Sequence, residues 1–367
     1  MRLFRCQNCD QVLYFENVRC ERCSSRLGYV PEQGLLHALA EAEGQAWRPL
    51  AMRGRAFRFC ANAAQDACNW LVPADEAQTF CRACRHNRTV PDLSRPENLP
   101  PWRRLEAAKH RLFYALLRLG LPAPSKAEDA EKGLAFDFLA DPPAPSGTNV
   151  MTGHSNGLIT IALAEADDAQ REARRVAMGE PYRTLLGHFR HEVGHYFWDR
   201  LVRDGGRLDD CRATFGDDTT DYAAALRRHY ADGAPANWQE RFVSAYAASH
   251  PWEDFAETWA HYLHIVDTLE TAATFGLRVN PRVDKEGALR AEMNFDPYGA
   301  GRCEALIEAW LPLTFAMNSL NRSMGESDVY PFILSPAVIG KIAFIHGLVH
   351  PAPGASIRER VTRNADG

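Results

Sequence analysis

The sequence predicts an α+β protein in which zinc-ribbon-like β modules at the N-terminus precede a mainly helical domain with a small sheet. Two observations lead to this expectation. Eight of the ten cysteines lie within the first 84 residues, whereas apolar residues recur at helical spacing from Trp102 onward. The length of 367 residues and the hydrophobic content of 46% are sufficient for two or three domains with buried cores.

The N-terminal cysteines have the spacing of metal ligands. They form two groups of four, and three of the four arms are C-x2-C pairs, which bring two thiolates onto one tetrahedral ion. We therefore predict two structural zinc ions. A disulfide scaffold is the alternative for both groups, and iron is an alternative for the first. The groups consist of Cys6, Cys9, Cys20 and Cys23, and of Cys60, Cys68, Cys81 and Cys84.

The charge distribution argues against nucleic acid as a partner. The formal net charge is −5, but residues 1–120 contain 18 Lys+Arg against 12 Asp+Glu, an excess of +6. Eight thiolates around two Zn²⁺ ions would reduce this excess to about +2. A strong electrostatic footprint for nucleic acid is therefore not expected.

The chain is expected to be cytoplasmic and to make no membrane contact. No run approaches the roughly 18 apolar residues that span a bilayer. The first residues, "MRLFRCQNCD", place polar residues and cysteines where a signal peptide requires an apolar segment. The same feature disfavours disulfides in the cysteine groups.

Proline content predicts the domain boundaries. Residues 91–101, "PDLSRPENLPP", read as a linker because proline lacks an N–H donor and has a fixed φ angle. We therefore expect a cysteine-rich zinc-binding region over residues 1–90, a second domain over 102–350 and a flexible tail over 351–367.

The second domain is expected to begin with an amphipathic helix, "WRRLEAAKHRLFYALLRLG", followed by two strands. The second strand, "GLITIALAEA", alternates apolar residues as a strand with one exposed face does. The last helix is predicted to start at Ser335 as N-cap and Pro336 at the first position. Further helices are expected at 168–202 with an interruption near "MGEPY", and at 219–231, 237–248, 252–274 and 303–323.

A pattern that can bind zinc lies within the first of these helical regions. In "GHFRHEVGHYFW", His191 and His195 are four residues apart, so on a helix both imidazoles project from one face and can bind a single ion. Glu192 then lies beside the metal, where it can accept a proton from activated water.

A second helix supplies the remaining candidate ligand. In "HPWEDFAETW", Glu253 and Glu257 are four residues apart, and aromatic residues flank them. Glu253 can be the third ligand of the ion, and Glu257 can accept the second N–H of a ligating histidine. The alternative for two acidic residues at this spacing is a solvated helix face.

These motifs resemble those of the gluzincin metallopeptidases, in which H-E-x-x-H is followed by a glutamate ligand on a later helix. The local pattern is similar to that of anthrax lethal factor, which has the same E-x-x-A-E and a tyrosine seven residues before the ligand. Here that position is Tyr246. The resemblance implies that Tyr246 stabilises the oxyanion or protonates the leaving amine.

The whole chain resembles a bacterial family of zinc-binding metallopeptidases that carry an N-terminal zinc ribbon. The resemblance rests on "CQNC", "HEVGHYFWDRLV", "HPWEDFAETWAHYLHI" and "NSLNRSMGESDVYPFILS". It implies a gluzincin-like fold and peptide-bond hydrolysis. By analogy with such peptidases, "GLITIALAEA" would be the edge strand along which an extended peptide pairs.

The sequence therefore predicts a zinc-dependent metallopeptidase with one catalytic and two structural zinc ions. Zinc held by His191, His195 and Glu253 would activate water, with Glu192 as base and Tyr246 as oxyanion donor. The expected partners are a peptide or protein substrate and a protein bound through the zinc-ribbon region. The alternative is a non-catalytic zinc-ribbon adaptor with a vestigial peptidase domain.

Overall fold

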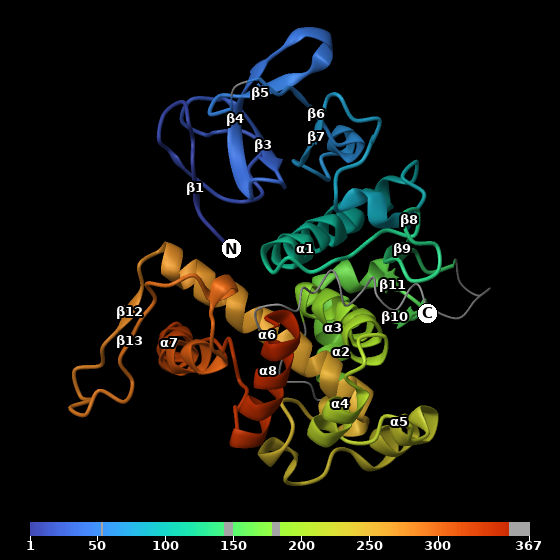
Figure 1. Cartoon of the computed structure of the whole chain (residues 1–367), viewed down its shortest axis with the longest axis vertical. Coiled ribbons are helices and arrows are strands. Elements are labelled where there is room, and N and C mark those ends of the chain that lie inside the picture. The colour runs from blue at the N-terminus through green and yellow to red at the C-terminus, as the bar shows by residue number, and fades with distance from the viewer. Residues whose placement is uncertain (53, 143–149, 178–183, 352–367) are drawn as a thin grey trace. The chain divides into compact units, whose positions relative to one another are not determined.

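The structure is a computed structural model that describes residues 1–52, 54–142, 150–177 and 184–351. The chain forms two compact units, Met1–Arg171 and Glu172–Gly367 (Figure 1). Short strands dominate the first 90 residues and helices dominate the remainder. The predicted α+β class is confirmed.

The first unit begins with two antiparallel sheets. The first sheet pairs β1 with β2, and the second has the order β3-β4-β5-β6-β7 with every neighbouring pair antiparallel. Their bounds are Phe4–Arg5, Val12–Leu13, Arg26–Val30, Leu35–Glu41, Trp47–Pro49, Phe57–Phe59 and Leu71–Pro73.

Apolar and aromatic side chains from several short strands form the core of this region. Val30, Leu39, Phe57 and Leu71 form one buried cluster. A second cluster is aromatic: its members are Phe15, Tyr29, Trp70 and Tyr114, with the rings of Tyr29 and Trp70 4.8 Å apart and those of Phe15 and Tyr114 5.4 Å apart. Through Tyr114, helix α1 packs into the same core as the strands.

Helix α1 spans Leu99–Arg118, with prolines in its first turn, where the missing N–H costs no hydrogen bond. The first unit also contains a four-stranded sheet with one strand before α1 and three after it; its order is β10-β11-β9-β8, with parallel pairing of β9 with both β8 and β11. The strands span Asn87–Thr89, Ala135–Leu139, Gly153–Ser155 and Leu158–Ala162, in the order β8 to β11.

The expectation that the strand in "GLITIALAEA" is an edge strand is wrong. Strand β11 ends at Ala162 and lies between β10 and β9, so both of its edges are paired. The edge is the three-residue strand β10, Gly153–Ser155. Sequence alternation identified the strand, but β10 follows a proline-rich segment and is too short to show a pattern.

The second unit is helical. Helix α2, Asp168–Ala177, spans the boundary between the units, and the two-stranded sheet of β12, Arg278–Val279, and β13, Ala291–Glu292, precedes α7. The other helices are α3, Leu185–Phe197; α4, Leu208–Phe215; α5, Tyr222–Asp232; α6, Pro251–Thr274; α7, Cys303–Ser323; and α8, Pro336–Val349.

Most predicted helices are present, with two differences. The prediction of a helix at 237–248 is wrong, because the structure has two short 3₁₀ turns there, Trp238–Glu240 and Tyr246–Ser249. The Ser244 hydroxyl accepts the N–H of Ala247 at 3.0 Å, a local bond that competes with helix hydrogen bonding. Helix α4 was not expected.

The start of the last helix can be compared with its prediction, whereas the predicted interruption and most of the predicted tail cannot. The last helix begins as expected, since the Ser335 hydroxyl accepts the N–H of Val338 at 3.3 Å. The interruption at "MGEPY" and residues 352–367 of the predicted tail lie outside the described residues. Among the described helices, none has the length and apolar character needed to cross a bilayer.

Helices α3 and α6 pack closely against each other in the second unit (Figure 1). Gly194 makes this approach possible, because a Cβ atom there would lie 3.0 Å from the Cα of Ala256 and 3.2 Å from its carbonyl oxygen. The rings of Phe197 and Trp259 stack at 4.9 Å beside this contact. The H-E-x-x-H motif therefore faces the start of α6.

Candidate metal centres

The candidate catalytic centre is built from the H-E-x-x-H turn of α3. Thr184 caps this helix by accepting the N–H of Gly187 at 3.0 Å. His195 and Glu192 are buried, at 3% and 8% exposed. Together with His191, these two polar side chains lie on the side of α3 that faces α6.

Glu253 comes to this face from the first turn of α6. His250 precedes it as N-cap, with Nδ1 accepting the N–H of Trp252 at 3.0 Å, and Pro251 is at the first helical position. A carboxylate in this position is favoured by the helix dipole. Glu253 is 1% exposed, so its charge is removed from water and needs a partner.

The structure brings one donor atom from each of His191, His195 and Glu253 together. The Nε2 atoms of the two histidines are 3.1 Å apart. Oε2 of Glu253 lies 3.0 Å from Nε2 of His191 and 3.4 Å from Nε2 of His195. Ligands about 2.0 to 2.1 Å from a tetrahedral ion are separated by roughly 3.3 Å. The three separations therefore fit one zinc ion.

The hydrogen bonds around His191 fix which of its nitrogens faces the other donors. Nδ1 lies 2.7 Å from Oε1 of Glu257, an acceptor, so Nδ1 donates its hydrogen and Nε2 is left with a lone pair in the neutral ring. Oε2 of Glu257 accepts the hydroxyl of Ser244 at 2.6 Å. Glu257 thus orients His191 and is itself held.

The electrostatics of the centre favour a cation. Burial acts to lower the pKa of His191, but hydrogen bonds and charges from Glu253 and Glu257 outweigh it and raise that pKa well above the ordinary value. Burial likewise acts to raise the pKa of Glu257, but the contacts with His191 hold it at about 2. Positive charge, carried by a proton or a metal ion, is stabilised between these carboxylates.

Glu192 differs from the other carboxylates of the centre. Burial raises its pKa above the ordinary value, and among the described residues no donor hydrogen-bonds to its Oε2. Glu192 is thus a buried carboxylate with a raised pKa and one unbonded oxygen beside the candidate metal centre.

Two tyrosines lie at the centre, and sequence reasoning found one of them. Tyr246, from the 3₁₀ turn before α6, has its ring centroid 6.0 Å from that of His191. Tyr222, from α5, donates its hydroxyl to Oε1 of Glu253 at 2.6 Å. Burial and the charge of Glu253 raise the pKa of Tyr222, and a hydrogen bond from Tyr246 partly offsets that rise.

Trp252 is a second residue that sequence reasoning missed. Its ring lies over that of His195, with centroids 3.7 Å apart and planes inclined by 31°. Its position directly before Glu253 was the available signal, because the first turn of α6 must face the two histidines.

The N-terminal cysteines form two further groups of donors. In each of the two predicted groups, the four sulfur atoms all lie within 4.8 Å of one another. The contacts include Cys6 to Cys23 and Cys9 to Cys20, both at 3.6 Å, and Cys68 to Cys81 at 3.7 Å. All ten cysteines lie in described ranges, and none is in a disulfide. Sulfur atoms about 2.3 Å from a tetrahedral ion are roughly 3.7 to 3.8 Å apart, so both groups fit zinc.

These donor sets and the fold define a zinc-binding protein with a histidine and glutamate centre on two packed helices. The chain belongs to the family described as putative zinc-binding metallo-peptidases, whose model matches residues 98–348. A zinc-ribbon domain family matches residues 3–95. Both parts of the predicted family resemblance are therefore confirmed.

Three relatives align with the chain over nearly its whole length. Uncharacterised proteins of Mycobacterium bovis and of two strains of Mycobacterium tuberculosis are 43% identical over 351 residues, which is 95% of this chain and 95% of each relative. No solved structure matches the chain.

Proposed function

We propose that this protein is a zinc-dependent metallopeptidase that hydrolyses peptide bonds with Glu192 as the general base. His191, His195 and Glu253 hold the catalytic ion, and the two cysteine groups hold structural ions. Zinc bound to the three-residue set acts as a Lewis acid that polarises the scissile carbonyl and lowers the pKa of water.

One observation carries the proposal. The lone pair on Nε2 of His191 faces Nε2 of His195 and Oε2 of Glu253 at 3.1 and 3.0 Å. Oε2 of Glu253 is buried and accepts no well-aligned hydrogen bond from the described residues. Three atoms that can ligate a metal thus converge in a buried place beside a carboxylate charge, and a metal ion between them would balance that charge.

The chain's own residues account for the proton transfers. Glu192 takes a proton from the attacking water and passes it to the leaving amine. The Tyr246 hydroxyl donates to the carbonyl oxygen as negative charge develops there. Tyr222 holds Oε1 of Glu253, so that Oε2 stays directed at the two histidines.

The substrate class follows from the reaction: a peptide or protein. The second candidate is an adaptor that binds proteins through the zinc ribbon and has no peptidase activity. Two features of the centre have no use in an adaptor. Oε2 of the buried Glu192 has no hydrogen-bond donor among the described residues, and Tyr246 lies beside His191. These two features favour the enzyme.

The test compares zinc-loaded wild-type protein with Glu192→Gln on a mixture of peptides, with cleavage read by mass spectrometry. Loss of the base should lower turnover by at least about 10²-fold while zinc content stays unchanged. Glu286→Gln, in the loop between β12 and β13, is the matched control because Glu286 is exposed. It should cleave as wild type does.

Either of two results would count against the proposal. Cleavage by Glu192→Gln at the wild-type rate removes Glu192 from the mechanism. A zinc-loaded wild-type protein that cleaves none of the peptides favours the adaptor.

A further inference from the structure

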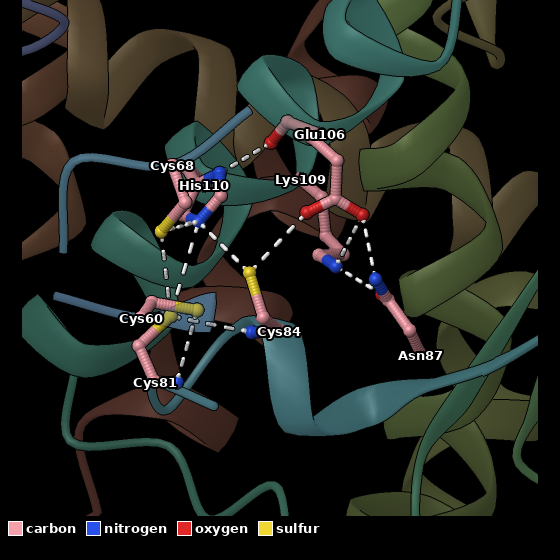
Figure 2. A network of polar contacts seen from close by, with 8 residues as sticks. All are labelled: Cys60, Cys68, Cys81, Cys84, Asn87, Glu106, Lys109 and His110. Carbon is pink, nitrogen blue, oxygen red and sulfur yellow. Dashed lines mark hydrogen bonds and ion pairs between the residues drawn. The ribbon is translucent and has the colours of Figure 1, made fainter. Parts of the chain in front are cut away.

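The second cysteine group, Cys60, Cys68, Cys81 and Cys84, is surrounded by polar side chains that do not belong to the zinc-ribbon match. Helix α1 contributes Glu106, Lys109 and His110, all of which are buried, and Figure 2 shows them directed at the sulfur atoms or at one another. A structural zinc ion takes four ligands. Here the cysteines already supply four, so the nearby histidine needs an explanation.

His110 is oriented by its own helix. Its Nδ1 lies 2.6 Å from the backbone carbonyl oxygen of Glu106, which can only accept a hydrogen bond. Nδ1 therefore carries the hydrogen, and in the neutral ring Nε2 carries the lone pair. A histidine that ligates a metal shows this arrangement, with the second nitrogen donating to a carbonyl or carboxylate.

The Nε2 atom of His110 faces three of the four sulfur atoms. It lies 3.2 Å from Sγ of Cys68, 3.5 Å from Sγ of Cys84 and 3.9 Å from Sγ of Cys81 (Figure 2). For a tetrahedral zinc ion with bonds of about 2.3 Å to sulfur and 2.0 to 2.1 Å to nitrogen, the nitrogen-to-sulfur separation is roughly 3.6 Å. The three distances bracket that value.

A neutral imidazole would be unfavourable here without a metal bond. If the zinc ion were held by four thiolates alone, no sulfur would carry a hydrogen, and the Nε2 lone pair would face three negatively charged atoms. A metal ion bonded to Nε2 removes this repulsion. The competing arrangement is a protonated imidazole whose Nε2–H donates to the thiolates.

We propose that His110 is a zinc ligand and that the second structural site is a Cys3His site formed by Cys68, Cys81, Cys84 and His110. Cys60 is the donor in surplus. Cys60 and Cys68 form the one arm of the two groups that lacks C-x2-C spacing, and of these two only Cys68 is among the sulfur atoms that His110 contacts.

The other two residues of α1 stabilise this arrangement. Lys109 donates to Oε1 of Glu106 at 2.9 Å and to Oδ1 of Asn87, and Asn87 in turn donates to Oε1 of Glu106 at 2.7 Å. The buried ammonium and carboxylate thus neutralise each other. The pair fixes Glu106, whose backbone carbonyl orients His110.

The proposal gives the second zinc ion a specific role. His110 lies within residues 98–348, the range of the metallopeptidase match, whereas the cysteines lie within residues 3–95 of the zinc-ribbon match. Zinc would therefore tie α1 to the ribbon by a direct bond inside the first unit. The inference is independent of the catalytic centre, because no residue is shared.

Cadmium-113 NMR of the full-length protein tests the ligand set, because each site gives its own resonance and replacing a thiolate by an imidazole moves that resonance upfield. We expect one four-sulfur signal from the first group and one signal moderately upfield of it from the second, while the sulfur-free centre of His191, His195 and Glu253 gives a third signal much further upfield. With ¹⁵N-labelled histidine, the upfield signal should show a cadmium-to-nitrogen coupling, and it should be the signal that disappears in Cys68→Ser. Two four-sulfur signals without such coupling would overturn the proposal.

Paired variants give a second readout. Cys60→Ser should keep both structural metals and the coupled signal, whereas His110→Ala should lower the metal affinity of the second site by at least roughly 10- to 100-fold. Glu286→Gln is the control for handling and loading. Loss of the metal in Cys60→Ser, with retention in His110→Ala, would show four-thiolate ligation with His110 as a hydrogen-bond donor and would refute the assignment.

Discussion

For a single residue, Tyr222, the hydrogen bond to Glu253 predicts an effect on zinc affinity and not on the hydrolysis step. Tyr222→Phe removes the hydroxyl that holds Oε1 of Glu253 at 2.6 Å but leaves all three proposed ligands. We expect zinc affinity at this centre to fall by about 10- to 100-fold, as is usual when an outer partner of a ligand is lost. Competition with a fluorescent zinc chelator measures the change, and wild-type affinity would contradict the role of Tyr222.

Tyr246 should behave in the opposite way. Its hydroxyl acts only when charge develops on the carbonyl oxygen, so Tyr246→Phe should keep zinc and KM and lower kcat by about 10² to 10³. Single-turnover kinetics on a cleaved peptide measures the chemical step. An unchanged rate would make Tyr246 a packed aromatic residue, and a change confined to KM would make it a binding contact.

The assignment of the third ligand is tested by the two glutamates of α6. Glu253→Ala should lose the catalytic zinc. Glu257→Ala removes the partner of Nδ1 on His191 and of the Ser244 hydroxyl but no proposed ligand, so it should lower zinc affinity by about 10- to 100-fold. Zinc content after gel filtration distinguishes the variants. If Glu257→Ala loses the ion and Glu253→Ala keeps it, the ligand lies one helical turn later.

Sequence reasoning reached the residues that follow a fixed spacing and missed those that do not. His191 and His195 are four residues apart on α3, and Glu253 and Glu257 are four residues apart on α6, so periodicity alone places each pair on one face. Tyr222 lies on a separate helix with no spacing rule to the centre. Its contact arises from the packing of α5 against the 3₁₀ turn Tyr246–Ser249, which directly precedes α6.

At the scale of elements, the crossing of α3 and α6 depends on Gly194. An alanine there would place Cβ 3.0 Å from Ala256 and 3.2 Å from Trp259. Such overpacking typically costs 1 to 3 kcal/mol, and the gain in helix propensity of about 1 kcal/mol offsets part of it. We expect Gly194→Ala to lower the free energy of unfolding by up to about 2 kcal/mol and to lower the zinc affinity of the proposed catalytic centre.

Gly340, in α8, is the matched control for this prediction. A Cβ atom there meets nothing within 4 Å, so Gly340→Ala should stabilise the protein by about 0.5 to 1 kcal/mol. Chemical denaturation of zinc-loaded protein measures both variants. A stabilising Gly194→Ala with normal zinc binding would show that the helix contact tolerates a methyl group.

Elements with strong periodicity could be predicted, and elements fixed by local side-chain bonds could not. Helices α1, α6 and α7 follow their apolar patterns closely. The segment at 237–248 has a helical composition, but it forms only two short 3₁₀ turns, and between them the Ser244 hydroxyl bonds to Ala247 and Glu257 instead of pointing to solvent. Strand β10, with three residues, is visible only through its pairing with β11.

Across the whole molecule, the three proposed zinc ions should differ in how readily a chelator removes them. The proposed cysteine sites hold together strands of only two to seven residues, so their metal binding should be coupled to folding. The proposed catalytic site would have three protein ligands and an open position. Mild chelation should therefore remove one of three zinc ions, stop hydrolysis reversibly and leave the fold intact.

Native mass spectrometry during stepwise chelation checks this order. Retention of two zinc ions in inactive protein is the expected intermediate. Loss of all metal in one step would show that the sites are coupled. An absence of metal from residues 1–90 would contradict the structural sites.

Anomalous diffraction at the zinc absorption edge, from crystals of the zinc-loaded protein, locates the ion directly and so tests the proposed metal centre. We predict a peak about 2.0 to 2.2 Å from Nε2 of His191, Nε2 of His195 and Oε2 of Glu253, with Glu192 beside it and with Glu257 bonded to His191 and Ser244 but not to the ion. A fully loaded protein with no peak between these three atoms, or with the ion on Glu257 in place of Glu253, would contradict it.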